Sequence, residues 1–198
     1  MLQYEKDFFA QGKKFPAGMD EAGRGPLAGP VFAAAVILNR DCVIEGLNDS
    51  KKLSEKKREQ LFNIIIEKAL AYSIASASVE EIEKVNILNA TYLAMNRAID
   101  GLKLNADFAL IDGNRVPEGI KIPCETIVKG DSKSQSIAAA SILAKVSRDR
   151  LLLEYDKQYP EYNFKKHKGY GTKEHTQAIL EYGPCPIHRM SFLKNILK

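Results

Sequence analysis

Cysteine is scarce in this sequence, and its distribution excludes two common ways of stabilising a small protein. Cys42, Cys124 and Cys185 are odd in number and widely spaced, which indicates neither a disulfide framework nor a zinc site. Cys185 and His188 have the spacing of a metal-binding pair, but no second pair stands at a suitable place along the chain. We therefore expect reduced structural thiols in a cytoplasmic protein.

The sequence also lacks any segment that would direct the chain into a membrane or out of the cell. Its first stretch, MLQYEKDFFAQGKK, is too charged for a signal peptide, and no apolar run approaches the roughly 20 residues that cross a bilayer. Internal repeats and low-complexity segments are missing as well. These absences predict a globular protein that does not bind membranes.

A strong excess of charge is absent too, since the formal net charge of the 198 residues is only +4. This small excess permits a polyanionic partner without requiring one. The basic residues are nevertheless clustered, at 51–52, 56–58 and 165–168. A solvated surface is the simpler interpretation of any single cluster, so the clusters alone do not indicate nucleic acid binding.

What the sequence does contain is an alternation of strand and helix patterns. Strand patterns occupy residues 14–20, 29–38, 71–79, 106–113 and 124–131, and helix patterns occupy residues 53–70, 80–102, 132–160 and 172–183. After a hairpin-like first pair of strands, this order is typical of a mixed α/β sheet flanked by helices. We expect residues 1–160 to form this α/β domain and residues 161–198 to form a small C-terminal helical lobe packed on it.

Three of the predicted strands end on acidic residues. Asp20 and Glu21 end the first strand, Asp112 ends the fourth and Asp131 ends the fifth. Carboxylates gathered at one edge of an α/β sheet would repel one another unless a cation held them, and all-oxygen ligands favour Mg²⁺ or Mn²⁺. Taken singly, Asp112 is also explained as turn chemistry and Asp131 as a helix cap. The coincidence of three such strand ends favours a metal site.

Two observations bear on which acids belong to this site. Adjacent strand residues face opposite sides, so Asp20 and Glu21 can share a site only if the strand ends or twists there, which Gly23 permits. Asp149 lies about 27 Å along a helix from the nearest of the other acids. Because Lys145 precedes it by four residues, a helix-surface ion pair explains Asp149, and we exclude it as a metal ligand.

The stretch GRGPLAG, which follows the first acid pair, indicates a turn that contacts a ligand. Its glycines at 23, 25 and 29 do not match the dinucleotide-binding pattern G-x-G-x-x-G, and its prolines prevent the helix that must follow that pattern. A dinucleotide-dependent enzyme is therefore a weak alternative. The glycines instead favour exposed backbone N–H and C=O groups that touch a ligand.

Two further motifs have the chemistry of phosphate and sugar contacts. Ser50, Lys51 and Lys52 precede a helix N-terminus, an arrangement that suits a phosphate, although an ordinary capped surface helix explains it equally well. In HKGYGT, Lys168 adds a basic group, and Tyr170 stands between two glycines that provide no wall to bury it. We expect the lysines to contact phosphates and the tyrosine to be exposed for stacking.

Taken together and in this order, the motifs resemble those of bacterial type 2 ribonuclease H, or ribonuclease HII. The resemblance runs from about Ala17 to Phe192 and rests on MDEAGRGPLAGP, NDSKKLSEKKR, LIDGNRVP, KGDSKSQSIAAASILAKVSRDR, HKGYGT and PIHRMSF. It implies a ribonuclease H-like fold that cleaves the RNA strand of RNA/DNA hybrids. It also implies cleavage at single ribonucleotides embedded in duplex DNA, leaving 5′-phosphate and 3′-hydroxyl ends.

The resemblance also implies roles for particular residues. The family's four carboxylates correspond to Asp20, Glu21, Asp112 and Asp131, which would hold Mg²⁺ or Mn²⁺, with two ions during catalysis. The family's ribonucleotide-sensing turn corresponds to Gly23, Arg24 and Gly25, and its junction-sensing tyrosine to Tyr170. We expect a monomer. A non-catalytic protein that binds hybrid duplexes is the alternative, and the complete set of four acids argues against it.

Overall fold

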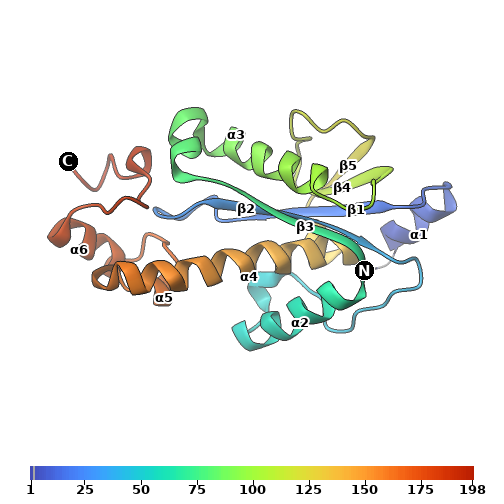
Figure 1. Cartoon of the computed structure of the whole chain (residues 1–198), viewed down its shortest axis with the longest axis horizontal. Coiled ribbons are helices and arrows are strands. Elements are labelled where there is room, and N and C mark those ends of the chain that lie inside the picture. Colours follow the sequence, from blue (N-terminus) through green and yellow to red (C-terminus); the bar gives the residue numbers. More distant parts are fainter. Residues whose placement is uncertain (2) are drawn as a thin grey trace.

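The chain folds around one mixed β-sheet (Figure 1), and the computed structural model describes residues 1 and 3–198. The strands lie in the order β3-β2-β1-β4-β5. Their bounds are Pro16–Ala22 for β1, Val31–Leu38 for β2, Ala69–Ala77 for β3, Phe108–Asp112 for β4 and Cys124–Ile127 for β5. β2 runs antiparallel to both β1 and β3, whereas β1, β4 and β5 are parallel. The predicted mixed sheet with an initial hairpin is confirmed.

Helices cover both faces of this sheet (Figure 1). α3 (Val79–Asp100) lies on one face, and α4 (Gln135–Gln158) lies on the other with α2 (Glu55–Lys68) packed against it. Alternate strand side chains supply two separate cores, with Met19 and Ile111 in the first and Ala34 and Val36 in the second. Within residues 1 and 3–198, no helix is long and apolar enough to cross a membrane.

α4 packs very closely on the sheet because small residues face it. Ala138, Ala139 and Ala140 are fully buried. Opposite the start of the helix stands Gly18, where a Cβ atom would lie only 2.1 Å from the carbonyl carbon of Ser136. Any side chain at position 18 would therefore push the helix away. Asp20, two residues later in β1 and on the same face, is consequently held against α4.

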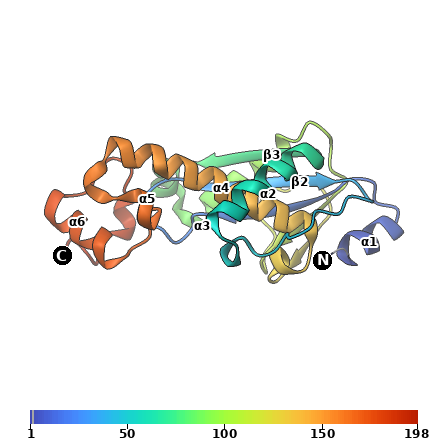
Figure 2. The ribbon, with the colours of Figure 1, turned by 90° about the horizontal axis from the view of Figure 1, so that it is seen from below.

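The C-terminal residues form a small lobe at the end of α4 (Figure 2). The lobe contains α5 (Phe164–His167), α6 (Lys173–Tyr182) and short 3₁₀ turns at Pro160–Tyr162 and Met190–Phe192. Phe164, Ile179 and Leu193 pack in its core against Leu152 of α4. The helix predicted at 172–183 is confirmed, and the lobe shares its core with the last turns of α4.

Several local features differ from the sequence patterns. The patterns do not predict α1 (Gln3–Ala10), whose Glu5 accepts hydrogen bonds from the Ser134 and Ser136 hydroxyls at the start of α4. α3 is kinked, because Asn86 has a φ of 68° and its side chain caps the following turn. β5 ends at Ile127, so Asp131 lies in a 3₁₀ turn and not at the end of a strand.

Candidate active site

The predicted acids of β1 and β4 meet at one edge of the sheet. The two strands are parallel, and Met19 lies opposite Ile111. Asp20 and Asp112 are the next residues along each strand, so their positions are neighbours at the carboxyl ends, where sites of α/β sheets form. This placement agrees with the interpretation of the strand ends drawn from the sequence.

The two acids of β1 lie on opposite faces, as strand alternation requires. Asp20 is buried on the α4 side, where it accepts a hydrogen bond of 2.7 Å from the N–H of Glu21. Glu21 instead lines a hollow of about 320 Å³ on the α3 side, together with Asp112, Leu88 and Met95. The two carboxylates therefore border the same sheet edge from its two faces.

Asp131 reaches the site through the turn that carries it. The Oδ1 atom of Asp112 accepts a hydrogen bond of 2.6 Å from the N–H of Gly130. This bond ties the 3₁₀ turn of Asp131 to the end of β4. Asp131 is largely buried there, which is unusual for a residue that only caps a helix. The fourth acid therefore lies beside the edge formed by β1 and β4.

Burial and neighbouring negative charges raise the pKa values of Asp20, Glu21 and Asp131. Burial raises the pKa of Asp20 well above its usual value, and the charges of Glu21 and Asp112 raise it further. Burial also raises the pKa of Glu21, although Arg24, at 3.2 Å, opposes the rise. The pKa of Asp131 is raised by burial and by Asp112. Such a group of buried, mutually repelling carboxylates is what a divalent cation would stabilise.

The donor atoms of the four acids suit a metal ion, but the side chains are too far apart in this structure to bind one together. Among the described residues, no three histidine, cysteine, aspartate or glutamate side chains are close enough together to chelate one ion. The pKa shifts reflect longer-range electrostatics, so the two observations are compatible. The donor set consists only of carboxylate oxygens, which suits Mg²⁺ or Mn²⁺ and not zinc.

A second hollow, of about 160 Å³, is also lined by Glu21. It gathers residues from the loop after β1, from the turn before α2, from α4 and from the C-terminal lobe. Its lining comprises Glu21, Ala22, Gly23, Arg24, Gly25, Ser50, Lys51, Ser141, Lys145 and Tyr170. Most of the predicted substrate-binding residues are thus brought together from distant parts of the sequence.

The predicted lysines do not all reach this hollow. Lys51 does, and although burial lowers its pKa, the charges of Asp20, Asp49 and Asp131 outweigh burial and raise it. Lys52 points elsewhere, with a side chain 63% exposed and 3.8 Å from Asp49. Lys168 is turned inward, and its Nζ donates a hydrogen bond to the carbonyl of Lys165. Of the three predicted lysines, Lys51 is therefore the one that lines the hollow.

Tyr170 is exposed at the rim of the hollow. Its side chain lies beside Gly25, where a Cβ atom would stand 3.8 Å from the ring, and the Nζ of Lys145 is 5.9 Å from the ring centre. With 42% of the residue exposed, the ring is open to a ligand on one side. The turn of Gly23, Arg24 and Gly25 faces this ring across the hollow.

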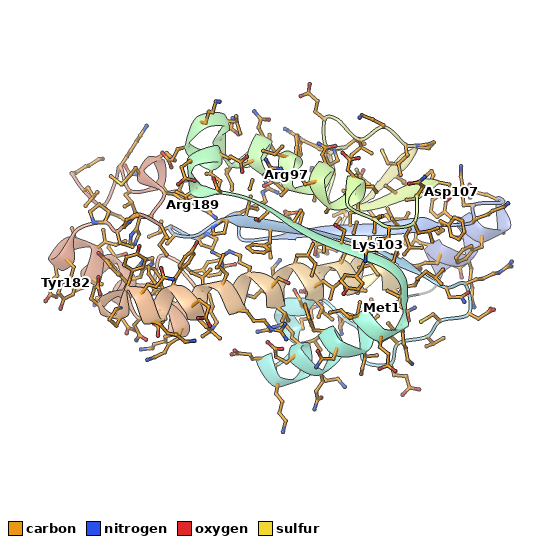
Figure 3. The ribbon with its side chains drawn as sticks, in the orientation of Figure 1. Met1, Arg97, Lys103, Asp107, Tyr182 and Arg189 are labelled. Carbon is orange, nitrogen blue, oxygen red and sulfur yellow. The ribbon has the colours of Figure 1, made fainter. Side chains whose placement is uncertain are left out.

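Sequence analysis missed two buried arginines that hold this turn in place. Arg189 donates to the carbonyls of Gly23 (2.6 Å), Arg24 (3.0 Å), Pro26 (2.8 Å) and Gly29 (2.9 Å). It comes from the C-terminal segment, at the end of the molecule where that segment approaches the sheet (Figure 3). Among the described residues it has no carboxylate partner. Burial lowers its pKa to about 9, so it remains charged at neutral pH.

Arg148 of α4 does the same for the next part of the loop. It donates to the carbonyls of Ala28 (2.9 Å), Pro30 (3.2 Å) and Lys168 (2.9 Å). A Cβ atom on Gly23, whose φ is 100°, would lie 2.2 Å from the Arg148 Nε. Glycine is therefore required at position 23 by both space and backbone conformation. The motifs KVSRDR and PIHRMSF contain these arginines, but nothing in their spacing signals burial.

The arginine contacts determine the direction of the neighbouring amides. In a trans peptide the C=O of one residue and the N–H of the next point in opposite directions, and the described chain has no cis peptide. Because Arg189 binds the carbonyls of Gly23 and Arg24, the N–H groups of Arg24 and Gly25 point away from it. Within the described residues these two N–H groups have no hydrogen-bond partner. They form a pair of donors available to a ligand.

Asp149 differs from expectation in one respect. It pairs with Lys145 at 2.7 Å, as predicted, but the helix-surface interpretation is wrong because Asp149 is only 5% exposed. Arg58 lies 3.9 Å from its other oxygen and donates to the carbonyls of Ser50 and Leu53. Asp149 therefore supports the loop of Ser50 and Lys51 from behind, which no local spacing in the sequence indicates.

Known proteins share both the sequence and the fold. A ribonuclease HII from Caldicellulosiruptor saccharolyticus is 56% identical over 197 residues, which cover 100% of this chain and 96% of the relative. A ribonuclease HII from Clostridioides difficile is 59% identical over 194 residues, covering 98% of this chain and 76% of the relative. The crystal structure of ribonuclease H2 from Pyrococcus horikoshii OT3 is 25% identical with a TM-score of 0.76, covering 89% of this chain and 93% of that chain.

The family model described as Ribonuclease HII matches residues 17–195, which span the sheet, the acids and the C-terminal lobe. The fold, with its mixed five-stranded sheet and flanking helices, is that of the ribonuclease H class. The chain therefore belongs to the ribonuclease HII family and is a metal-dependent endonuclease that acts on RNA/DNA hybrids.

Proposed function

We propose that this protein also recognises single ribonucleotides embedded in duplex DNA and cuts on their 5′ side, leaving 5′-phosphate and 3′-hydroxyl ends. The observation that carries the proposal is the hollow where Glu21, the turn of Gly23, Arg24 and Gly25, and Tyr170 meet. Glu21 at the sheet edge, the unpaired N–H groups of the turn and the Tyr170 ring all border this hollow. A single nucleotide and its neighbour would be read there together.

We assign the metal ions to Asp20, Glu21, Asp112 and Asp131. When bound, two Mg²⁺ or Mn²⁺ ions would supply an activated water and stabilise the leaving 3′ oxygen. The chain's own contribution is a set of oxygen ligands on parallel strands and a tied turn, which limits how far each carboxylate can move. Lys51 adds a positive charge beside them that suits a substrate phosphate.

The free amides give a physical reason for selecting a ribonucleotide. The 2′-hydroxyl is the group that separates RNA from DNA locally, and it can accept a hydrogen bond. The N–H groups of Arg24 and Gly25 point away from Arg189, whose four carbonyl contacts hold the turn, and both residues line the hollow. A donor pair that is already oriented costs little entropy to use.

Tyr170 would check the neighbouring sugar. Its ring lies opposite Gly25, so a nucleotide bound at the turn has its neighbour near the ring. We propose that the ring packs on the deoxyribose that follows the ribonucleotide. An added 2′-hydroxyl on that sugar would crowd the ring. This contact would report an RNA-to-DNA junction.

Lys51→Ala should flatten the dependence of log affinity on log salt by about one unit, the effect of one lost phosphate contact. The reason is that Lys51 lies in the hollow beside the acids. Binding to a hybrid duplex is measured over a range of salt concentrations. Lys52→Ala is the matched control, because Lys52 is adjacent in sequence but points away from the hollow. Equal slopes for Lys51→Ala and the wild type would remove Lys51 from the phosphate site.

The proposed function is tested by cleavage of a DNA duplex that contains one ribonucleotide. Products are mapped to nucleotide resolution with and without Mg²⁺ or Mn²⁺, and an all-DNA duplex of the same sequence is the control. We expect one metal-dependent cut on the 5′ side of the ribonucleotide. Cleavage of a continuous hybrid without cleavage of this duplex would contradict the proposal. A monomeric state and a cytoplasmic location remain predictions.

A further inference from the structure

All three histidines of the chain lie together inside the C-terminal lobe. His167, His175 and His188 are each at most 7% exposed. The His167 and His175 rings stack with centres 4.3 Å apart, and Phe164 packs edge-on against both. Nothing in the reaction described above uses them. Their hydrogen bonds, however, lead to Tyr170.

The contacts of His188 determine where its proton lies. Its Nδ1 accepts a hydrogen bond of 2.9 Å from the N–H of Cys185, and the Cys185 sulfur is 3.1 Å from the same nitrogen. Burial raises the pKa of the Cys185 thiol to about 11, so the thiol keeps its proton, and the backbone N–H of Cys185 can only donate. The Nδ1 atom is therefore unprotonated. In a neutral imidazole the proton must then be on Nε2.

The same reasoning continues to His175. Its Nε2 lies 3.0 Å from the Nε2 of His188, which donates, so the Nε2 of His175 accepts. The proton of His175 must consequently be on Nδ1, which lies 2.9 Å from the carbonyl oxygen of Tyr170. One pattern of protons thus satisfies every contact from Cys185 through both histidines to the Tyr170 backbone.

The segment before Tyr170 is anchored by two long-range bonds, in which the carbonyls of Lys168 and Gly169 accept from Arg148 and from the N–H of Leu27, and the His175 bond adds an anchor at Tyr170 itself. Gly169 and Gly171 flank the tyrosine, and glycine leaves the backbone free to adopt other conformations. The Tyr170 carbonyl also accepts from the N–H of Thr172, and the N–H of Tyr170 donates to the carbonyl of His167. These two bonds are local and move with the segment. The His175 bond connects the segment to α6 and, through His188, to the C-terminal strand contact at Ala28.

We propose that His188 and His175 form a positioning relay that holds the backbone of Tyr170, and therefore its ring, at the rim of the substrate hollow. The relay rests on the proposed function, in which Tyr170 reads the sugar after the ribonucleotide. His188 holds His175 in the Nδ1-protonated form, and His175 holds Tyr170. Neither histidine touches the substrate.

The surroundings keep this pattern stable near neutral pH. Burial lowers the pKa of His175 and of His188 to about 4, and the charge of His167 opposes a second proton on either ring. The other titratable groups nearby affect the pKa values of His167 or Cys185 instead. Glu174, Asp156 and Lys166 act on His167, and Glu161 acts on Cys185. The Tyr162 hydroxyl donates to the carbonyl of Gly183. The relay should break only as the pH falls towards 4, when two N–H groups would face each other.

Two substitutions of His188 separate the relay from simple packing. In His188→Gln the side-chain amide reaches the position of Nε2 and can still donate to His175, but it no longer serves Cys185. In His188→Asn the side-chain oxygen reaches the position of Nδ1 and still accepts from Cys185, but the donor to His175 is lost. Each variant loses one of two bonds, so their thermal stabilities should be similar, and the two serve as matched controls.

The first measurement is the ¹⁵N chemical shifts of the His175 ring in the full-length protein. We expect Nδ1 to be protonated in the wild type and in His188→Gln, and the Nε2-protonated form to appear in His188→Asn. An Nε2-protonated His175 in the wild type would overturn the relay. This measurement needs no substrate, so it remains decisive even if Tyr170 proves not to read the junction.

The second measurement is kcat/KM on a lone embedded ribonucleotide divided by kcat/KM on a continuous RNA strand. For His188→Asn we expect this ratio to fall about fivefold, the scale of one net hydrogen bond, and for His188→Gln to stay near the wild-type value. Equal ratios for the two variants would overturn the positioning role. If Tyr170→Ala itself leaves the ratio unchanged, it is the proposed function of Tyr170 that fails.

Discussion

Asp112→Asn should lower kcat for hybrid cleavage by more than about 100-fold, because residues that only orient metal ligands already contribute about 10- to 100-fold. Asp112 is the central acid of the four. Its charge raises the pKa values of Asp20, Glu21 and Asp131, so it faces all three. An asparagine oxygen can still accept the Gly130 N–H, so the turn of Asp131 should stay in place. The change therefore removes a charge and spares the fold.

The measurement is single-turnover cleavage of a hybrid at saturating Mg²⁺ and at saturating Mn²⁺, with thermal unfolding recorded alongside. Asp149→Asn is the control, because Asp149 is also buried but lies with Lys145 and Arg58 behind the site. We expect it to lower the unfolding temperature while keeping substantial activity. Asp20→Asn, Glu21→Gln and Asp131→Asn should resemble Asp112→Asn. Near-normal turnover of any of these four would remove that residue from the metal site.

Tyr170→Ala should reduce cleavage of a lone embedded ribonucleotide about five- to 100-fold more than cleavage within continuous RNA. Base–aromatic stacking is worth about 1–3 kcal/mol, and the contact of the ring with a deoxyribose should be comparable. The structure supports this scale because the ring is exposed on one side and bordered by Gly25 on the other. A continuous RNA strand has no deoxyribose at that position, so Tyr170→Ala should reduce its cleavage less.

The comparison is kcat/KM on both substrates for the wild type and three variants. Tyr170→Phe keeps the ring and should stay close to the wild type, because a packing contact does not need the hydroxyl. Tyr182→Ala removes a more exposed tyrosine from the outer side of the C-terminal lobe and should change the cleavage of neither substrate (Figure 3). Equal losses on both substrates for Tyr170→Ala would make Tyr170 a general binding residue.

Membership of the ribonuclease HII family rules out the two alternative functions considered from the sequence. A non-catalytic hybrid-binding protein and a dinucleotide-dependent enzyme were each compatible with part of the sequence. The match to ribonucleases HII over the full length of the chain shows that the protein is a nuclease. The glycines at 23, 25 and 29 independently weaken the dinucleotide alternative, because their spacing does not match G-x-G-x-x-G.

Local patterns were enough to predict most of the secondary structure and the position of three acids. Ser54 caps α2 and Gly101 ends α3 as their positions suggest, because capping depends on a few neighbouring residues. The acids Asp20, Glu21 and Asp112 lie within two residues of the carboxyl ends of two parallel strands, close to where the hydrophobic pattern places them. The order of the motifs, beyond any single pattern, was sufficient to indicate the family.

The sequence by itself therefore determined the order of strands and helices and the chemistry of the acids, since both depend on residues close together in the chain. Only the tertiary structure decided which charged residues are buried. Arg189 binds carbonyls 160 or more residues away, Lys168 turns inward, and Asp149 supports a distant loop. Whether a charge meets water or a buried partner depends on which segments the fold brings together, and no local spacing records that.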